Sequence, residues 1–211
     1  MTLVFQASIL IQGEFIQMAI VEKYGRCGSL LDLERLKIQT KDIITYLPTG
    51  KTQPKYQYFN TGIARSRGAE MELKYDFGRG TYLAMNYTYT TMQMHDPDQN
   101  LWNFPKHMGT LMGNVRLTRH LNLNSYLLYR GGWTRPVTDP PDDRDDPPDY
   151  AIVNATLIAR NFGGWFKGFE LRGSVYNLFD KNYKSPQDKT AFPEDMPMPD
   201  RAFLFEVRYS F

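Results

Sequence analysis

The side chains best suited to metal or redox chemistry lie in one short segment, Met92-Gln93-Met94-His95. Thioether sulfur and imidazole nitrogen are ligands for haem iron and copper. The same segment also fits a solvated loop with an ordinary surface histidine. His107 and His120 lie apart from it, and no nucleophile stands beside a general base. We therefore predict neither an enzyme nor a bound cofactor or metal.

An acidic, proline-rich segment at residues 134–149 (TRPVTDPPDDRDDPPD) also carries groups that could bind a ligand. Six carboxylates at this density could coordinate calcium through oxygen. The segment lacks the glycine-bearing spacing of a dedicated calcium loop, however, and its prolines favour an extended, solvated chain. We interpret it as an exposed loop.

The composition excludes several classes of protein. The 25 basic and 23 acidic side chains leave a net charge of +2, which indicates no nucleic-acid partner. The single cysteine, Cys27, cannot form an internal disulfide. No run approaches the 18 apolar residues of a transmembrane helix. A transmembrane β-barrel stays compatible, because its lipid-facing residues alternate with polar ones.

Period-two alternation of apolar and polar residues begins at about residue 68. In residues 69–77, Leu73 and Tyr75 share one face, whereas Glu72 and Lys74 share the other. A helix would scatter these charges around its surface, so the pattern predicts strands. It recurs in residues 82–90, 106–119, 121–131, 150–161, 168–178 and 201–211.

The connections between these segments alternate between short and long. The short ones are at 78–80, 119–120 and 161–167, and the long ones are at 95–105, 132–149 and 180–200. An antiparallel meander then has short turns at one end and long loops at the other, as outer-membrane barrels do. Segments of about ten residues also suit tilted membrane-crossing strands. We predict an all-β fold: an antiparallel transmembrane β-barrel meander.

Upstream, the pattern weakens. Residues 42–47 (DIITYL) are typical of a strand, and residues 1–41 are a poorly defined segment with at most one strand, near 19–27. The chain thus supplies about eight or nine strands.

Three motifs carry a family resemblance. Residues 175–183 (VYNLFDKNY), 203–211 (FLFEVRYSF) and 60–72 (NTGIARSRGAEME) resemble segments of TonB-dependent outer-membrane receptors. The resemblance implies that the last strand carries a signal read by the barrel-assembly machinery, through Phe205, Val207, Tyr209 and Phe211.

The sequence departs from the family in two ways. The family's Pro-Gly-Arg before the last strand is Pro199-Asp200-Arg201, and nothing resembles the plug domain. A barrel of roughly 22 strands needs many more residues than this chain has. We interpret residues 42–211 as the C-terminal portion of the barrel, from a fragment or a truncated gene. The lack of a targeting signal at Met1 agrees with this, and we expect no energy-dependent uptake from residues 1–211 alone.

The resemblance also implies a function. Such receptors lie in the outer membrane of Gram-negative bacteria and take up scarce nutrients, most often ferric siderophores, with energy delivered through the TonB protein. The expected partners are therefore outer-membrane lipid, TonB, the barrel-assembly machinery and an iron–siderophore or similar small ligand. Mapping the family's ligand region onto this chain selects Trp102, Phe104, Tyr126, Arg130, Trp133 and Tyr176. Aromatic rings and guanidinium groups suit an anionic or catecholate iron chelate. Each aromatic residue could instead be only an interfacial anchor.

Two other interpretations remain open at this level. One is a complete eight-stranded outer-membrane barrel that acts as an adhesin or structural protein. The other is a soluble β-sandwich ligand binder, since alternation marks any half-buried antiparallel sheet. The sandwich requires the apolar faces to pack together in a dry centre, whereas a membrane barrel turns them outward.

Overall fold

The computed structural model describes residues 2–10, 15–24, 27–41, 44–48, 56–60, 63–95, 99–100, 104–135, 143–161, 163, 167–187, 189 and 192–210. None of these residues forms a helix with the length and hydropathy needed to cross a bilayer.

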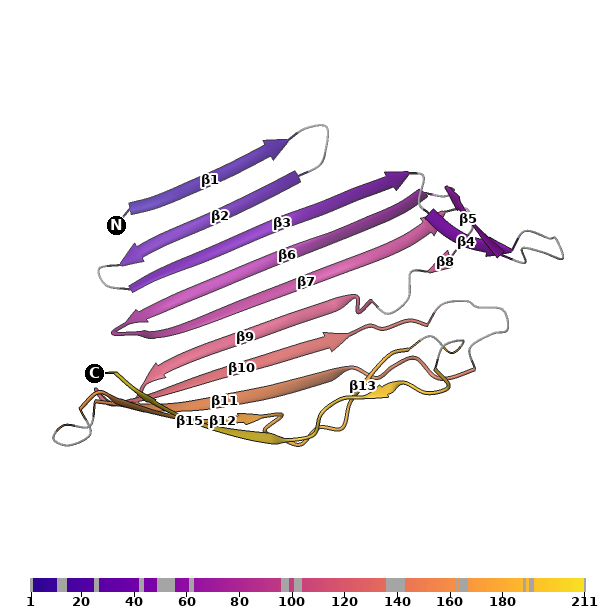
Figure 1. The fold of residues 1–211 in the computed structure, drawn as a ribbon. Coiled ribbons are helices and arrows are strands. Elements are labelled where there is room, and N and C mark those ends of the chain that lie inside the picture. Colours follow the sequence, from indigo (N-terminus) through magenta and orange to yellow (C-terminus); the bar gives the residue numbers. More distant parts are fainter. Residues whose placement is uncertain are drawn as a thin grey trace.

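One antiparallel sheet dominates the structure (Figure 1). Its strands lie side by side in the order in which they occur in the sequence: β1 (Thr2–Leu10), β2 (Phe15–Tyr24), β3 (Cys27–Lys41), β6 (Ile63–Gly78), β7 (Thr81–His95), β9 (His107–Arg116), β10 (Leu121–Gly131), β11 (Tyr150–Arg160), β12 (Phe169–Tyr176) and β15 (Ala202–Tyr209). A short strand, β8 (Gln99–Asn100), pairs with β7. Two separate ribbons pair β4 (Ile44–Pro48) with β5 (Tyr56–Asn60), and β13 (Lys184–Ser185) with β14 (Met196–Pro197). The meander predicted from residue 68 onward is confirmed.

Strand register sorts the side chains onto two faces. Leu73, Met85, Leu111, Leu127 and Val153 are successive Cα partners across five strands. Directly opposed residues of antiparallel strands project to the same side of the sheet. From β3 to β15, odd-numbered residues therefore form one continuous, mainly apolar face, and even-numbered residues form the other, more polar face.

The apolar face is exposed rather than packed. Large odd-numbered side chains such as Leu111, Leu157, Phe205 and Val207 are 37–80% exposed. Among the described residues, no large side chain is fully buried. A sheet without a dry centre contradicts the β-sandwich interpretation, since a sandwich buries its apolar faces against each other.

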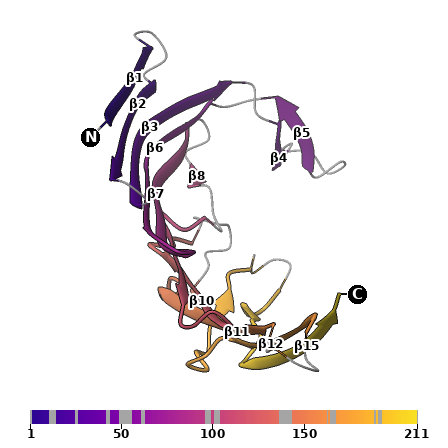
Figure 2. The ribbon, with the colours of Figure 1, turned by 90° about the vertical axis from the view of Figure 1, so that its left-hand side faces the viewer.

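The sheet is a single curved layer. Figure 2 shows it as an open arc from β1 to β15, with β4, β5 and β8 on the hollow side. The even-numbered face carries buried Ala84, Ile152 and Ser174, and Tyr150 on this face packs against Tyr183 of the connection 177–201. Even-numbered side chains thus face the concave side of the sheet. The described strands form part of a barrel wall and do not close into the eight-stranded barrel considered above.

The turns and loops segregate by length, as predicted. At the short-turn end, Gly78-Arg79-Gly80 joins β6 to β7 with all three φ angles positive, and Thr118 Oγ1 accepts hydrogen bonds from the backbone N–H groups of His120 and Leu121 between β9 and β10. At the opposite, long-loop end lie the connections 132–149 and 177–201. This asymmetry matches that of outer-membrane barrels.

The N-terminal part differs from the prediction. Residues 1–41 contribute three strands rather than at most one, and residues 44–48 pair with β5 outside the main sheet. The described strand count therefore exceeds the eight or nine expected. The segment 92–95, expected at the edge of a loop, is the last part of β7. Whether residues 42–211 form a unit of their own stays a prediction.

Candidate functional site

Aromatic side chains form a row at the long-loop end. The rings of Trp133 and Tyr150 are stacked with centroids 6.5 Å apart, and those of Tyr150 and Tyr183 lie 4.8 Å apart. Arg130 of β10 is the Cα partner of Tyr150. The Trp133 Nε1–H is the one buried side-chain polar atom without a hydrogen-bond partner in the described part of the chain. A buried, unsatisfied donor beside aromatic faces and a cation is a feature that a polar ligand could satisfy.

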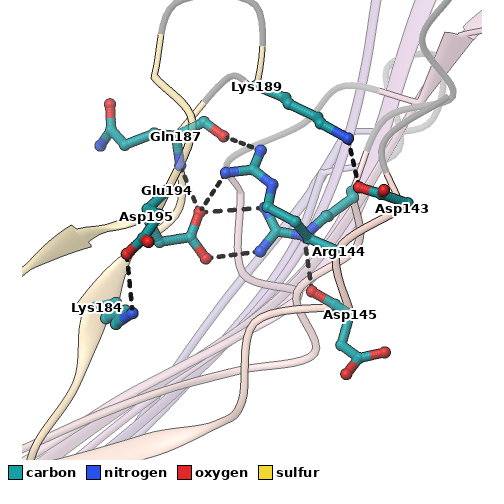
Figure 3. Close-up of polar contacts among 9 residues, drawn as sticks. Asp143, Arg144, Asp145, Lys184, Gln187, Lys189, Glu194 and Asp195 are labelled. Atoms are coloured by element: carbon teal, nitrogen blue, oxygen red, sulfur yellow. Dashed lines mark hydrogen bonds and ion pairs between the residues drawn. The ribbon is translucent and has the colours of Figure 1, made fainter. Parts of the chain in front are cut away.

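An ion-pair cluster ties together the two long connections that frame this row (Figure 3). Asp195 accepts hydrogen bonds from Arg135 at 2.6 and 3.2 Å, from Arg144 at 3.4 Å and from the Gln187 backbone N–H at 3.0 Å. These three charged side chains are only 10–17% exposed. Arg144 also donates to the Gln187 carbonyl at 2.8 Å. We call Arg135, Arg144, Gln187 and Asp195 the loop clasp.

The electrostatics of the loop clasp favour a charged carboxylate. Burial alone would raise the pKa of Asp195, but hydrogen bonds from Arg135 and from the Gln187 backbone, together with the charges of both arginines, lower it below its usual value. Two further pairs are more exposed: Lys189 with Asp143 also joins the two connections, whereas Lys184 with Glu194 lies within the connection 177–201. The acidic loop is therefore held, at least at residues 135 and 143–146, rather than fully solvated as we expected.

A second polar network lies where β10 meets the same loop. Asp149 accepts hydrogen bonds from the Tyr129 hydroxyl at 2.7 Å and the Gly132 backbone N–H at 2.8 Å, and the first of these chiefly lowers the pKa of Asp149. Tyr87 and His107 Nδ1 are also hydrogen-bonded, at 2.7 Å. These contacts fix the start and the end of the connection 132–149 to the rim of the sheet.

The residues predicted to bind ligand are spread along the wall. Arg130 and Trp133 come together beside Tyr150. Phe104 lines a separate small hollow of about 210 Å³ near Tyr89 and Thr134. Tyr126 lies further along β10 on the concave side of the sheet, opposite Met112 and Asn154. Tyr176 ends β12 and is 44% exposed. Trp102 lies outside the described residues.

The residues assigned to the assembly signal lie on the last strand. Phe205, Val207 and Tyr209 are 80%, 71% and 53% exposed on the apolar face of β15, and Tyr209 packs against Phe169 at 4.7 Å. Phe211 lies outside the described residues. Their role in assembly stays a prediction.

Sequence reasoning did not single out the loop clasp or the contact between Tyr150 and Tyr183. The one available signal for the clasp was the pair of arginines within the acidic loop, which must find carboxylates, but their partner Asp195 lies 60 and 51 residues away.

The fold is that of a β-barrel wall, and comparison with known proteins assigns the chain to a family. The model of the family "TonB dependent receptor-like, beta-barrel" matches residues 31–178, so the chain belongs to this family. No curated protein matches it.

Solved structures with the same fold are consistent with this assignment. They include the ferric-catecholate import receptor Fiu of E. coli K12 in its closed form (18% identity, TM-score 0.67). Others are the ferripyoverdine receptor of the Pseudomonas aeruginosa outer membrane bound to ferripyoverdine (17%, 0.72) and an R480A mutant of the P. aeruginosa ferric enterobactin receptor PfeA in complex with enterobactin (20%, 0.67). Each match covers 93% of this chain, but only 27%, 27% and 31% of the three receptors, respectively. The chain thus spans less than a third of their length.

Proposed function

We propose that this chain forms part of the barrel wall of a receptor in the outer membrane of a Gram-negative bacterium, and that the receptor imports a ferric siderophore with energy supplied through TonB. Membership of the family supports the receptor class. The names of the three structural neighbours, all receptors for iron or siderophore ligands, support the ligand class. The barrel-assembly machinery and outer-membrane lipid would be further partners.

The observation that carries the ligand assignment is the aromatic row beside Arg130. Trp133 and Tyr150 offer faces on which a planar catecholate can stack. The guanidinium of Arg130 can form charge-assisted hydrogen bonds with anionic oxygens. The Trp133 Nε1–H, buried and without a partner, supplies one more donor. Together they match an anionic, aromatic iron chelate better than an apolar or cationic ligand.

We place ligand contact at Trp102, Phe104, Tyr126, Arg130, Trp133 and Tyr176, and add Tyr150 and Tyr183. Arg130 and Trp133 form the centre because they adjoin Tyr150. Phe104 and Tyr176 would contact a ligand only where it extends beyond this centre.

A titration tests the ligand class. The folded protein in detergent is titrated with a ferric catecholate siderophore, and binding is followed by quenching of tryptophan fluorescence. We expect saturable quenching that weakens about tenfold in Arg130→Gln, since a hydrogen bond to a charged group contributes roughly 1.5 kcal/mol or more.

The matched control is Arg119→Gln, which removes a guanidinium at the opposite, short-turn end and should leave the affinity unchanged. Equal quenching by the iron complex and by a non-chelating phenol would contradict the proposal, because it would show no recognition of the complex.

A further inference from the structure

Two short turns place arginines around a hollow at the short-turn end. The β6–β7 turn holds Arg79 and the β9–β10 turn holds Arg119, and the two turns are neighbours because β7 pairs with β9 (Figure 1). Between them lies a hollow of about 800 Å³. Its lining combines apolar side chains with the arginines of the two turns: Phe77, Val115 and Leu117 with Arg79 and Arg119.

The apolar part of this hollow belongs to the outward face. Phe77, Val115 and Leu117 are odd-numbered and are 55%, 42% and 50% exposed. They continue the face that carries Leu83 and Leu111 further along the strands. In a membrane, this surface would meet acyl chains close to where the strands leave the bilayer.

The cations of the hollow have no partner among the residues that the structure describes. Across the residues that the structure describes, the guanidinium groups of Arg79, Arg116 and Arg119 form no ion pair and no hydrogen bond, although other arginines of the same wall, such as Arg160 and Arg172, pair with Glu170. All three unpaired arginines are exposed. The guanidinium groups of the two turns, Arg79 and Arg119, attract an oxyanion, which they can bind through paired N–H donors.

Backbone strain at Arg79 is a second, independent observation. Arg79 has a φ of 55°, between two glycines that also have positive φ. Glycine or asparagine adopts this conformation more readily than arginine. A glycine at position 79 would therefore stabilise the turn, so the arginine side chain lowers the stability of the protein. Such strain is typical of a position kept for function.

We propose that this hollow binds an anionic phospholipid of the periplasmic leaflet. Arg79 and Arg119 hold the phosphate, and one acyl chain lies against Phe77, Val115 and Leu117. The combination favours a lipid over free phosphate, because free phosphate would leave the apolar lining exposed. The inference rests on the proposed membrane location, since short turns face the periplasm in such barrels.

The test uses the folded chain in a non-ionic detergent and native mass spectrometry. Short-chain phosphatidylglycerol is titrated against phosphatidylcholine of the same chain length and, in a separate arm, inorganic phosphate. We expect one phosphatidylglycerol to bind at least tenfold more tightly than phosphatidylcholine, and millimolar phosphate not to displace it.

The main variant is Arg79→Gly, because strain relief should raise the resistance of the protein to urea while phosphatidylglycerol affinity falls about tenfold. Opposite changes in stability and affinity cannot come from misfolding. Arg119→Gln is the second variant, with the same expected loss of affinity. The matched control is Arg65→Gln/Arg67→Gln, which removes two exposed arginines from the same face of β6 at its other end and should change affinity less than threefold.

Three outcomes would overturn the proposal: equal binding of both lipids, an equal loss in the Arg65→Gln/Arg67→Gln control, or displacement by inorganic phosphate, which would indicate a simple oxyanion site. Failure of the proposed receptor function looks different. If the protein binds phosphatidylglycerol selectively but binds no ferric siderophore, the receptor proposal is wrong and the lipid site stands. If the protein stays soluble in buffer without detergent, the proposed membrane location is wrong.

Discussion

At the scale of single residues, Asn177 explains why the motif VYNLFDKNY has its form. Asn177 is 4% exposed and has a φ of 50°, a conformation that asparagine tolerates. Its side chain accepts a hydrogen bond from the Lys181 backbone N–H at 2.8 Å and donates to the carbonyls of Lys181 and Pro199 at 2.9 and 3.4 Å. One amide thus joins the end of β12 to the approach to β15.

We expect Asn177→Ala to lower the free energy of unfolding by about 2–4 kcal/mol, because it removes these hydrogen bonds and puts a Cβ-bearing residue without a polar group at positive φ. Urea-induced unfolding in lipid vesicles measures this. Asn177→Gly is the control: it loses the same hydrogen bonds but tolerates the backbone, so it should destabilise by about 1 kcal/mol less. An alanine variant as stable as the parent would contradict the role of the side chain.

Trp133 is the residue that best separates ligand binding from stability. Because its buried Nε1–H has no partner, Trp133→Phe should change the free energy of unfolding, measured by urea titration, by no more than about 0.5 kcal/mol. If this N–H serves a ferric siderophore, the same variant weakens siderophore binding about tenfold. Isothermal titration calorimetry measures the affinity, since this variant removes one of the fluorescent reporters. Unchanged affinity would remove Trp133 from the ligand site.

At the scale of elements, the loop clasp decides whether the connections 132–149 and 177–201 act as one body. Asp195→Asn removes the charge shared by two arginines, whose side chains are only 10% and 17% exposed. We expect a cost of about 2–3 kcal/mol in local stability, between the values for surface and buried pairs. Limited proteolysis at residues 134–149 should become much faster. Glu194→Gln, a change of an 82% exposed neighbour, should leave the rate unchanged.

The same clasp should be sensitive to acid. Hydrogen bonds from Arg135 and the Gln187 backbone, against the effect of burial, lower the pKa of Asp195 in the folded loops. Its contribution to stability is therefore fully present above the ordinary aspartate pKa of about 3.9 and is lost as the pH falls through the lower folded-state pKa. Hydrogen exchange of the two connections should accelerate below about pH 4 in the parent. In Asp195→Asn it should already be fast at pH 7, and an unchanged pH profile in this variant would contradict the assignment.

At the scale of the whole molecule, the two faces of the sheet should respond oppositely to charge. Leu111 is 37% exposed on the outward face of β9, and its neighbour Thr110 faces the concave side of the sheet. We expect Leu111→Lys to destabilise the protein in lipid vesicles by about 2–4 kcal/mol, because the charge enters the hydrocarbon layer. Thr110→Lys, the matched control on the other face, should cost about 1 kcal/mol or less. Urea titration in vesicles gives both values, and equal costs would contradict lipid contact at Leu111.

The success of the sequence interpretation varies along the chain for a physical reason. From β6 onward, each strand meets different solvents on its two faces, so the apolar and polar residues alternate and the strands can be read directly. β1 and β2 contain neighbouring apolar residues, as in Leu3-Val4-Phe5 and Ala19-Ile20-Val21, so the two faces have no contrast. For this reason β1 was missed, and β2 was predicted only in part, as a strand near residues 19–27.

The sequence alone determined the antiparallel all-β meander, because solvent contact on either side of a strand and loop length are local properties that its residues record. It also pointed to Arg130 and Trp133, which are close together in the chain. Only the tertiary structure brought Asp195 to Arg135 and Arg144, Tyr183 to Tyr150, and the arginines of two separate turns to one hollow. Those contacts join residues far apart in the chain, and strand register and the path of the long connections decide which of many equally compatible side chains become neighbours.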